Sequence, residues 1–131
     1  MRISVISIPV MDQAKALEFY EGVLGFEKKL DIPLGEGNRW LTLVSKELPD
    51  GPQILLEPAP LHFEPAKVFQ KALYDAGIPW TQFDVDDVQA EYDRLAEKGV
   101  QFQIKPTEMG TVKIIVFDDT CGNKIQLVEM L

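Results

Sequence analysis

The sequence predicts an α+β fold made of two β-α-β-β-β modules, because the same order of elements occurs twice. The stretch from Val10 to Phe26 joins the end of a strand, a helix and a glycine stop, and a weaker copy begins at Val85. An Asp stands at the head of each helix, Asp12 in the first copy and Asp87 in the second. Three short segments with alternating apolar and polar residues follow each helix, which is the pattern of half-buried strands.

The first half is expected to run strand, helix and three strands. Residues 3–10 alternate as a strand with one apolar face, and Asp12 is a good N-cap for the next helix. That helix carries apolar residues at helical spacing, with Phe19 and Tyr20 as core residues, and Gly25 ends it with a left-handed cap. Three strands are then expected, separated by turns at 35–38 and 49–52, at residues 27–33, 39–44 and 53–57.

A connecting stretch leads into the second half. Residues 64–77 carry apolar residues at helical spacing and predict a short helix or an irregular connection. A strand at 80–85 is followed by a helix that Asp86 or Asp87 caps and Gly99 ends. The remaining strands are expected at residues 100–104, 111–117 and 124–129.

The turn at 118–123 contains three residues that could be taken for functional groups. Asp118 and Asp119 are expected to be turn formers rather than metal ligands, and Gly122-Asn123 can take positive φ and close the hairpin. Cys121 has no histidine near it in the sequence, so we expect it to be structural.

Composition and charge exclude several classes of protein. With 131 residues, 46% of them hydrophobic and 26% charged, the chain is expected to form one globular domain, residues 1–131. We place module one at about residues 1–60, the connection at about 61–78 and module two at about 79–131. A net charge of −8 argues against nucleic acid, and no apolar run approaches the roughly 18 residues of a membrane span. The first residues read as a strand rather than a signal peptide, and one cysteine allows no internal disulfide, so we expect a cytoplasmic protein.

The paired halves resemble the glyoxalase/bleomycin resistance protein/dioxygenase (vicinal oxygen chelate) superfamily. The resemblance rests on FYEGVLGFE in the first half and on FDVDDV, GV and FDDTCGNKIQLVE in the second, and it covers residues from Ile3 to Val128. It implies a glyoxalase-like domain in which two modules curl their mixed sheets around a shared cavity, and it implies a homodimer. Enzymes of this superfamily bind one divalent metal through four side chains, His or Gln, Glu, His and Glu, and the metal polarises a substrate oxygen.

The residues at the corresponding positions of this chain do not suit a metal. The resemblance places the four ligand positions on Val5, Leu55, Trp80 and Gln126. Valine, leucine and tryptophan offer no donor for such a cation, and one neutral amide cannot hold it. We therefore expect no metal and no cofactor.

A displaced metal site is the alternative that this pattern leaves open. Glu57 has the same strand parity as Leu55, and the single histidine, His62, lies beyond Pro58 with Glu64 two residues on. Glu57, His62 and Glu64 could form a small site, although an exposed loop histidine is the more common situation.

Strand parity predicts the side chains that line the cavity. Trp80 could stack on a planar or cationic ligand or plug an unused cavity, and the Gln126 amide needs a partner, which can be a side chain, water or a ligand. Arg39 could pair with an anionic ligand or lie on the surface. The predicted ligand-binding cleft consists of Val5, Ser7, Trp40, Thr42, Leu55, Glu57, Trp80, Gln82 and Gln126, and Val128 shares their parity.

These observations favour a metal-free protein that binds a small organic molecule in the cleft between its two modules, as bleomycin resistance proteins do. A first alternative is a metal-dependent lyase, isomerase or dioxygenase of the glyoxalase type with a displaced site using Glu57. A second is a non-catalytic dimeric interaction module with a vestigial cavity. The expected partners are a small-molecule ligand and a second copy of the chain, with neither nucleic acid nor membrane.

Overall fold

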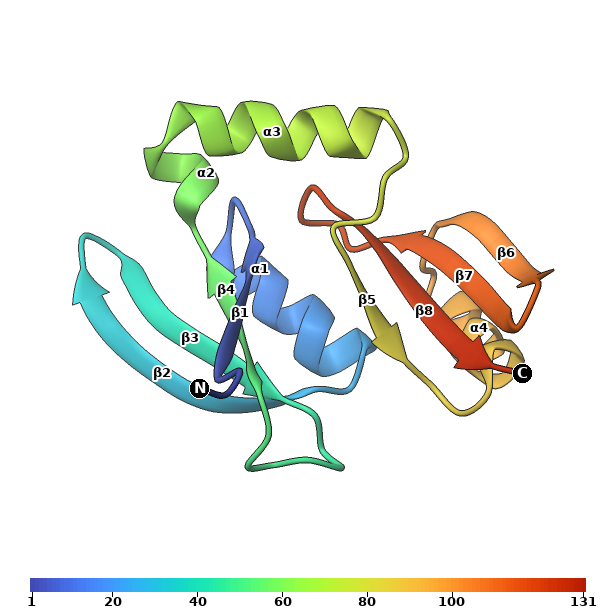
Figure 1. Cartoon of the computed structure of the whole chain (residues 1–131). Helices are drawn as coiled ribbons and strands as arrows, with labels where there is room; N and C mark the ends of the chain where they lie inside the picture. Colours follow the sequence, from blue (N-terminus) through green and yellow to red (C-terminus); the bar gives the residue numbers. More distant parts are fainter. The chain divides into compact units, whose positions relative to one another are not determined.

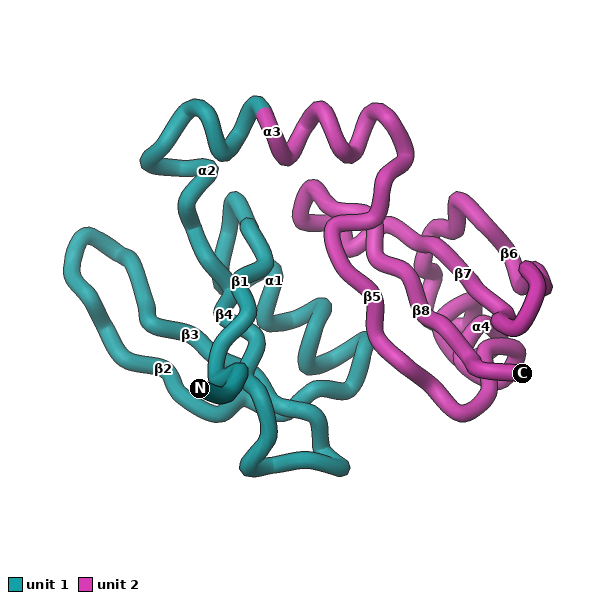
Figure 2. The backbone as a smooth tube through the Cα atoms, viewed as in Figure 1, with its two compact units in different colours: residues 1–68 teal, residues 69–131 magenta.

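The computed structural model describes residues 1–131 and divides the chain into two compact units, residues 1–68 and 69–131 (Figure 2). The boundary falls within one helix, α3 (Glu64–Asp75), which begins in the first unit and ends in the second. No helix of the structure combines the length and the apolar character needed to cross a membrane.

The first unit is a four-stranded mixed sheet with helices. Its strands are β1 (Val5–Pro9), β2 (Glu27–Gly35), β3 (Asn38–Val44) and β4 (Gln53–Glu57), in the spatial order β1-β4-β3-β2. β1 runs parallel to β4 and the other neighbours are antiparallel. Its helices are α1 (Gln13–Leu17), the π-helix η1 (Glu18–Val23) and α2 (Ala59–His62) (Figure 1).

The second unit repeats this arrangement. Its strands are β5 (Thr81–Asp84), β6 (Phe102–Met109), β7 (Val112–Asp118) and β8 (Lys124–Met130), in the order β5-β8-β7-β6 (Figure 1). β5 is parallel to β8, and α4 (Val88–Glu97) connects β5 to β6. Because both sheets have the same strand order and the same single parallel pair, the prediction of two β-α-β-β-β modules is confirmed.

Each unit has a core between its helix and one face of its sheet. In the first, α1 contacts β3 and β4, and the fully buried side chains include Ile8, Leu41, Leu43, Leu56 and Tyr20. In the second, α4 contacts β6, β7 and β8 over Val88, Leu95, Ile115, Phe117 and Ile125, which are also fully buried. Burial of side chains of this size is the main favourable term for each unit.

The predicted helix boundaries are confirmed by the caps. Asp12 Oδ1 accepts a hydrogen bond from Lys15 N at 3.0 Å, and Asp87 Oδ1 accepts one from Ala90 N at 2.9 Å. Gly25 adopts φ +91° and Gly99 φ +80°, the left-handed conformation that ends a helix without a Cβ clash. Asp87, rather than Asp86, is therefore the cap of α4.

Beyond shifts of one or two residues at strand ends, three elements differ from the prediction. The first helix changes from α to π geometry at Glu18, and the connecting stretch contains the additional short helix α2. Strand β6, which was predicted to end at Ile104, continues through Pro106 to Met109. Proline lacks a backbone N–H, but β6 is an edge strand, and the pairing shifts register between Ile104 and Thr107, which is where proline is tolerated.

Candidate functional site

The face of the first sheet that is turned away from α1 carries most of the predicted ligand-binding residues of this unit. Ser7 lies opposite Leu55 on the parallel neighbour, and Leu55 lies opposite Thr42 on the antiparallel one. Thr42 in turn lies opposite Leu30 on β2. Because directly paired residues share a face, these four side chains form one row across the sheet.

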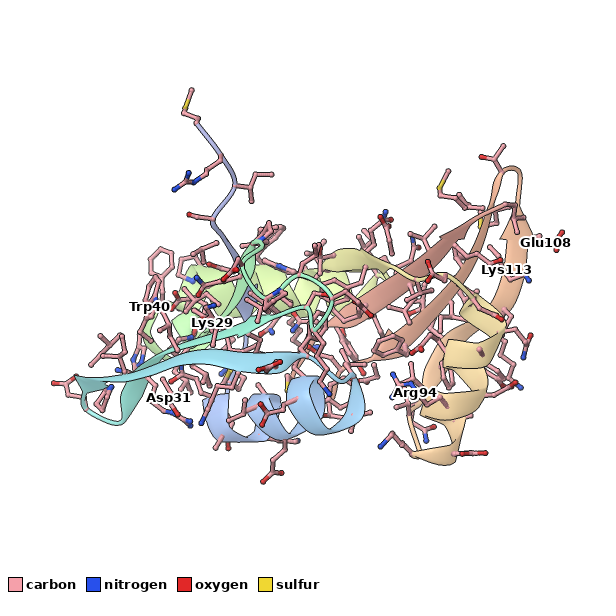
Figure 3. The ribbon with its side chains drawn as sticks, turned by 90° about the horizontal axis from the view of Figure 1, so that it is seen from below. Lys29, Asp31, Trp40, Arg94, Glu108 and Lys113 are labelled. Atoms are coloured by element: carbon pink, nitrogen blue, oxygen red, sulfur yellow. The ribbon has the colours of Figure 1, made fainter.

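The other predicted residues of the first unit lie on either side of this row. Trp40 lies opposite Ile32, and Figure 3 shows Trp40 and Asp31 on opposite sides of the β2–β3 hairpin, with Asp31 on the side of α1. Val5 lies opposite Gln53, and Glu57 lies opposite Pro9 at the end of β4. Several apolar side chains of this face remain accessible, with exposed fractions of 37% for Val5, 38% for Leu30 and 49% for Ile32.

Two polar atoms on the same face are buried without a hydrogen-bond partner. They are the hydroxyl oxygen of Thr42 and the amide oxygen Oε1 of Gln53. An unsatisfied buried polar atom costs about 1–3 kcal/mol, so each needs an explanation. Gln53 is absent from the predicted cleft, although its parity with Leu55 and Glu57 in β4 was a signal that could have placed it there.

The opposite face is held together by a polar side chain that sequence reasoning missed. Gln13 is buried, and its Nε2 donates to Arg39 O at 2.7 Å and to Leu56 O at 2.9 Å. Its Oε1 accepts from Arg39 N at 3.0 Å. Gln13 thus connects the first turn of α1 to β3 and β4 by hydrogen bonds. In the sequence, only its position in the first helical turn could have indicated this role.

Arg39 forms an ion pair within its own hairpin. Its Nε and Nη2 lie 2.9 and 2.8 Å from the two carboxylate oxygens of Asp31. This hydrogen-bonded guanidinium lowers the pKa of the Asp31 carboxyl, and Asp31 in turn raises the pKa of Arg39. Arg39 is half-buried, and its guanidinium is engaged by Asp31 in the structure.

The open face of the second sheet carries an amide pair. Gln82 lies opposite Gln126 in the parallel β5–β8 pair, and Gln126 Nε2 donates to Gln82 Oε1 at 3.0 Å. Val116 lies opposite Gln126 on β7. Trp80 precedes β5, where its backbone N–H donates to Lys124 O at 2.8 Å and its ring makes an edge contact with Phe69 at 5.7 Å between centroids.

The β7–β8 turn is a polar network that is hydrogen-bonded to the middle of α3. Buried Asp119 accepts from Cys121 N at 2.7 Å, Asn123 N at 2.9 Å and Asn123 Nδ2 at 2.7 Å. Gln70 of α3 donates to Asn123 Oδ1 at 3.1 Å and to Cys121 O at 3.3 Å. Cys121 is itself buried, so these residues stabilise the turn and are not exposed as reactive groups.

Tyr74 extends the same network. Its hydroxyl donates to Asp118 Oδ2, and this hydrogen bond, with burial second, raises the pKa of Tyr74 to about 12. Lys124 Nζ lies 3.7 Å from Asp118 Oδ2 and 4.3 Å from the centre of the Tyr74 ring. Of the two residues predicted to take positive φ, Gly122 does so at +101°, whereas the second in this turn is Thr120 at +62° rather than Asn123.

The side chains at the four corresponding positions do not fit the divalent metal that the family resemblance implies. Val5 and Trp80 stand in corresponding places, each seven residues before its capping Asp, and Leu55 and Gln126 correspond on the central strands β4 and β8. No group of three or more His, Cys, Asp or Glu side chains in the structure could hold a metal ion. His62 ends α2, exposed, with its Nε2 2.9 Å from Asn38 Oδ1.

Comparison with known proteins identifies the family. The family model described as "Glyoxalase/Bleomycin resistance protein/Dioxygenase superfamily" matches residues 2–127. The chain is similar to "Uncharacterized protein YurT" of Bacillus subtilis (strain 168), with 54% identity over 98% of this chain and 99% of that protein.

Two solved structures extend the comparison. The crystal structure of UcmS2 superimposes with a TM-score of 0.83 at 32% identity, covering 98% of both chains. TnmS3, described as an antibiotic binding protein from Streptomyces sp. CB03234, gives a TM-score of 0.75 at 26% identity over 100% of this chain and 97% of that one.

Proposed function

The chain belongs to the glyoxalase/bleomycin resistance protein/dioxygenase superfamily, and on this basis we propose that it binds a small organic molecule without a metal ion. The open faces of its two sheets supply the binding residues, and no bond is made or broken. Membership alone does not decide this, because one fold serves many functions.

The observation that carries the proposal is the chemistry of four corresponding positions. Val5, Leu55, Trp80 and Gln126 offer apolar, aromatic and amide groups at the four positions where the resemblance implies His or Gln, Glu, His and Glu in the metal-dependent enzymes. Such side chains suit an organic molecule, since ligand sites are mostly apolar with a few polar groups that orient the ligand. In the first unit, the exposed apolar side chains near Trp40 extend the sheet face that carries Leu55.

One structural relative supports this class of ligand. TnmS3 is described as an antibiotic binding protein, and the chain matches it over its full length. By analogy, the ligand of this chain is expected to be a compact organic molecule with a substantial apolar surface. The net charge of −8 on the protein favours a neutral or cationic ligand over an anionic one.

The proposal is tested by a thermal-unfolding screen of the purified protein against planar aromatic antibiotics and natural products. A ligand at a hundred times its Kd stabilises the folded state by about 2.7 kcal/mol, which gives a readily measured rise in Tm. Reproducible hits with micromolar Kd values support the proposal. Absence of hits, together with stabilisation by Ni²⁺, Zn²⁺, Mn²⁺ or Fe²⁺, overturns it in favour of the metal-dependent alternative at Glu57.

A substitution in the second unit locates the binding surface. For any hit, Trp80→Ala is expected to weaken binding at least tenfold, because it removes the largest aromatic surface beside Gln82. The control is Leu48→Ala, which truncates an exposed side chain in the β3–β4 loop. Equal affinity of both variants and the parent protein would place the ligand elsewhere.

A homodimer is the expected assembly. β2 exposes Leu30, Ile32 and Leu34 at 38%, 49% and 62% along one edge of its sheet, which is a surface that a second copy could cover. Size-exclusion chromatography with light scattering measures the mass directly. A monomer of 14.8 kDa at micromolar concentration would contradict the expectation.

A further inference from the structure

We infer that Gln82 and Gln126 recognise a hydrogen-bond donor and an acceptor on neighbouring atoms of the ligand, as in a lactam or an imide. The inference deepens the proposed function and rests on it. It names the chemical class that the second sheet is built to recognise: a neutral planar molecule with an amide-like edge.

The two amides form a pair with unused hydrogen-bonding groups. Gln126 Nε2 donates to Gln82 Oε1 at 3.0 Å. Each amide has two N–H donors and one carbonyl acceptor, so this bond leaves the carbonyl of Gln126 and the NH₂ of Gln82 available on two adjoining side chains. If the O and N atoms of both side-chain amides are exchanged, Gln82 becomes the donor and Gln126 the acceptor of the bond. One carbonyl acceptor and one NH₂ donor are again left free.

The pair is accessible on the open face of the sheet. Gln82 is exposed and Gln126 is half-buried, on adjacent parallel strands, and α4 contacts β8 from the opposite face, where Ile125 and Leu127 are buried. Val116, the other neighbour of Gln126, is buried and apolar. An amide between an apolar floor and solvent is well placed to meet a polar edge of a bound molecule.

An aromatic side chain lies beside the pair. Trp80 lies just before β5, two residues or about 7 Å of extended chain from Gln82, and its backbone N–H continues the pairing with β8 by donating to Lys124 O at 2.8 Å. Its edge contact with Phe69 at 5.7 Å restricts the rotation of the indole ring. The separation between Trp80 and the amides is about the length of a bicyclic ring system. A planar ligand of that size could therefore contact Trp80 with its rings and the two amides with its edge.

The charges around the pair disfavour an anion. Asp84 follows Gln82 by two residues on the same strand face and is exposed. The nearest cation on the neighbouring strand, Lys124, is held by Asp118 at 3.7 Å and by the ring of Tyr74 at 4.3 Å. A carboxylate or phosphate at this place would be repelled by Asp84, and no free cation would compensate for the repulsion. A neutral imide carries no charge and is not repelled.

The fold itself does not require this pair. Ser7 and Leu55 occupy the corresponding places in the first unit, since they also face each other across the parallel strand pair of their sheet. That unit forms the same strand order with a hydroxyl and an apolar side chain. The amide pair is thus a feature of the second unit alone, which favours recognition over a structural role.

The experiment compares two probes that differ by one donor, 1,8-naphthalimide and N-methyl-1,8-naphthalimide, in ligand-observed NMR titrations of the full chain. Methylation removes the imide N–H and keeps the aromatic rings and both carbonyls. The parent protein is expected to bind the unmethylated probe about tenfold more tightly, the loss of one well-placed hydrogen bond. In Gln126→Leu, which introduces the residue found at the corresponding position of the first unit, the preference for the unmethylated probe is expected to fall well below tenfold, because the acceptor next to the Gln82 donor is lost.

The control is Gln89→Leu on α4, an exposed glutamine that bonds to Asp93 of its own helix and should preserve the tenfold preference. Equal binding of both probes to the parent protein, or an unchanged preference in Gln126→Leu, overturns the inference. A third outcome separates the inference from the proposed function. If neither probe binds, but a compound from the screen binds in a way that is weakened by Trp80→Ala and unaffected by Gln126→Leu, the inference fails and the proposed function stands. If no compound binds at all, both fail.

Discussion

At the scale of single residues, the hydroxyl of Thr42 stands out because it is buried and unpaired. Thr42 has no exposed surface, and its hydroxyl lies in the row formed with Ser7 and Leu55. In this conformation the hydroxyl lies beneath the surface of the predicted cleft. It carries the desolvation penalty of a polar group without the compensating bond.

Thr42→Val is therefore expected to stabilise the protein. The change keeps the side-chain volume and removes the unpaired hydroxyl, so the free energy of unfolding should rise by about 1 kcal/mol and Tm by a few degrees. Urea unfolding measures the change. Thr107→Val is the control, because the Thr107 hydroxyl donates to Lys105 O at 2.7 Å and its loss should bring no gain. A destabilised Thr42→Val would show that the hydroxyl has a partner in solution.

Tyr74 predicts a pH dependence of stability at alkaline pH. Its pKa is raised to about 12 by the hydrogen bond to Asp118, above the value of about 10 expected in the unfolded chain. The stabilising bond is present below pH 10 and is lost as the pH rises towards 12, because the unfolded state releases the proton first. The difference in unfolding free energy between the parent protein and Tyr74→Phe should shrink across this interval. A constant difference from pH 9 to 11.5 would contradict the assignment.

At the scale of elements, the strands and caps could be predicted because their signals are local. Alternation places Gln53–Glu57 on a strand, and Asp12 and Asp87 mark two helix starts. The π-helix Glu18–Val23 could not be predicted, since its residues also suit an α-helix and no local signal selects between the two forms. The extension of β6 through Pro106 was missed because proline usually ends a strand, and only the edge position allows it here.

The repeated caps permit a matched test. Asp12→Ala and Asp87→Ala are each expected to lower the free energy of unfolding by about 1 kcal/mol, because each removes a carboxylate that accepts from the first helical turn. Asp86→Ala changes the neighbouring exposed carboxylate and should cost little. Denaturant unfolding of the three variants distinguishes them, and an equal loss in Asp86→Ala would point to a general charge effect.

At the scale of the whole molecule, the duplicated architecture followed from the repeated order of elements and from the family resemblance, and strand parity predicted which side chains share a face of each sheet. The hydrogen-bonded pairing of Gln82 with Gln126 could be anticipated only as the need of an amide for a partner. Gln13 and Gln53 escaped prediction because a glutamine in a first helical turn or at a strand start is usually solvated. The burial of Gln13 and of the Oε1 atom of Gln53 depends on strands distant in sequence, which no local pattern contains.

Metal content is the prediction that belongs to the complete chain. Protein purified without chelator is expected to hold far less than one metal ion per chain, and Tm should not change on addition of EDTA or of divalent cations. The expectation follows from the side chains at Val5, Leu55, Trp80 and Gln126. Elemental analysis showing one ion per chain, lost together with stability on chelation, would instead support a site that includes Glu57.

The two tryptophans are divided between the two units, Trp40 on β3 in the first and Trp80 before β5 in the second. Each half therefore contains its own intrinsic fluorophore. Trp40→Phe and Trp80→Phe leave a single emitter in one half at a time, so the unfolding of each repeat can be recorded without any external label. Coincident transitions would show that the two copies unfold as one cooperative unit, and separate transitions would give the stability of each copy.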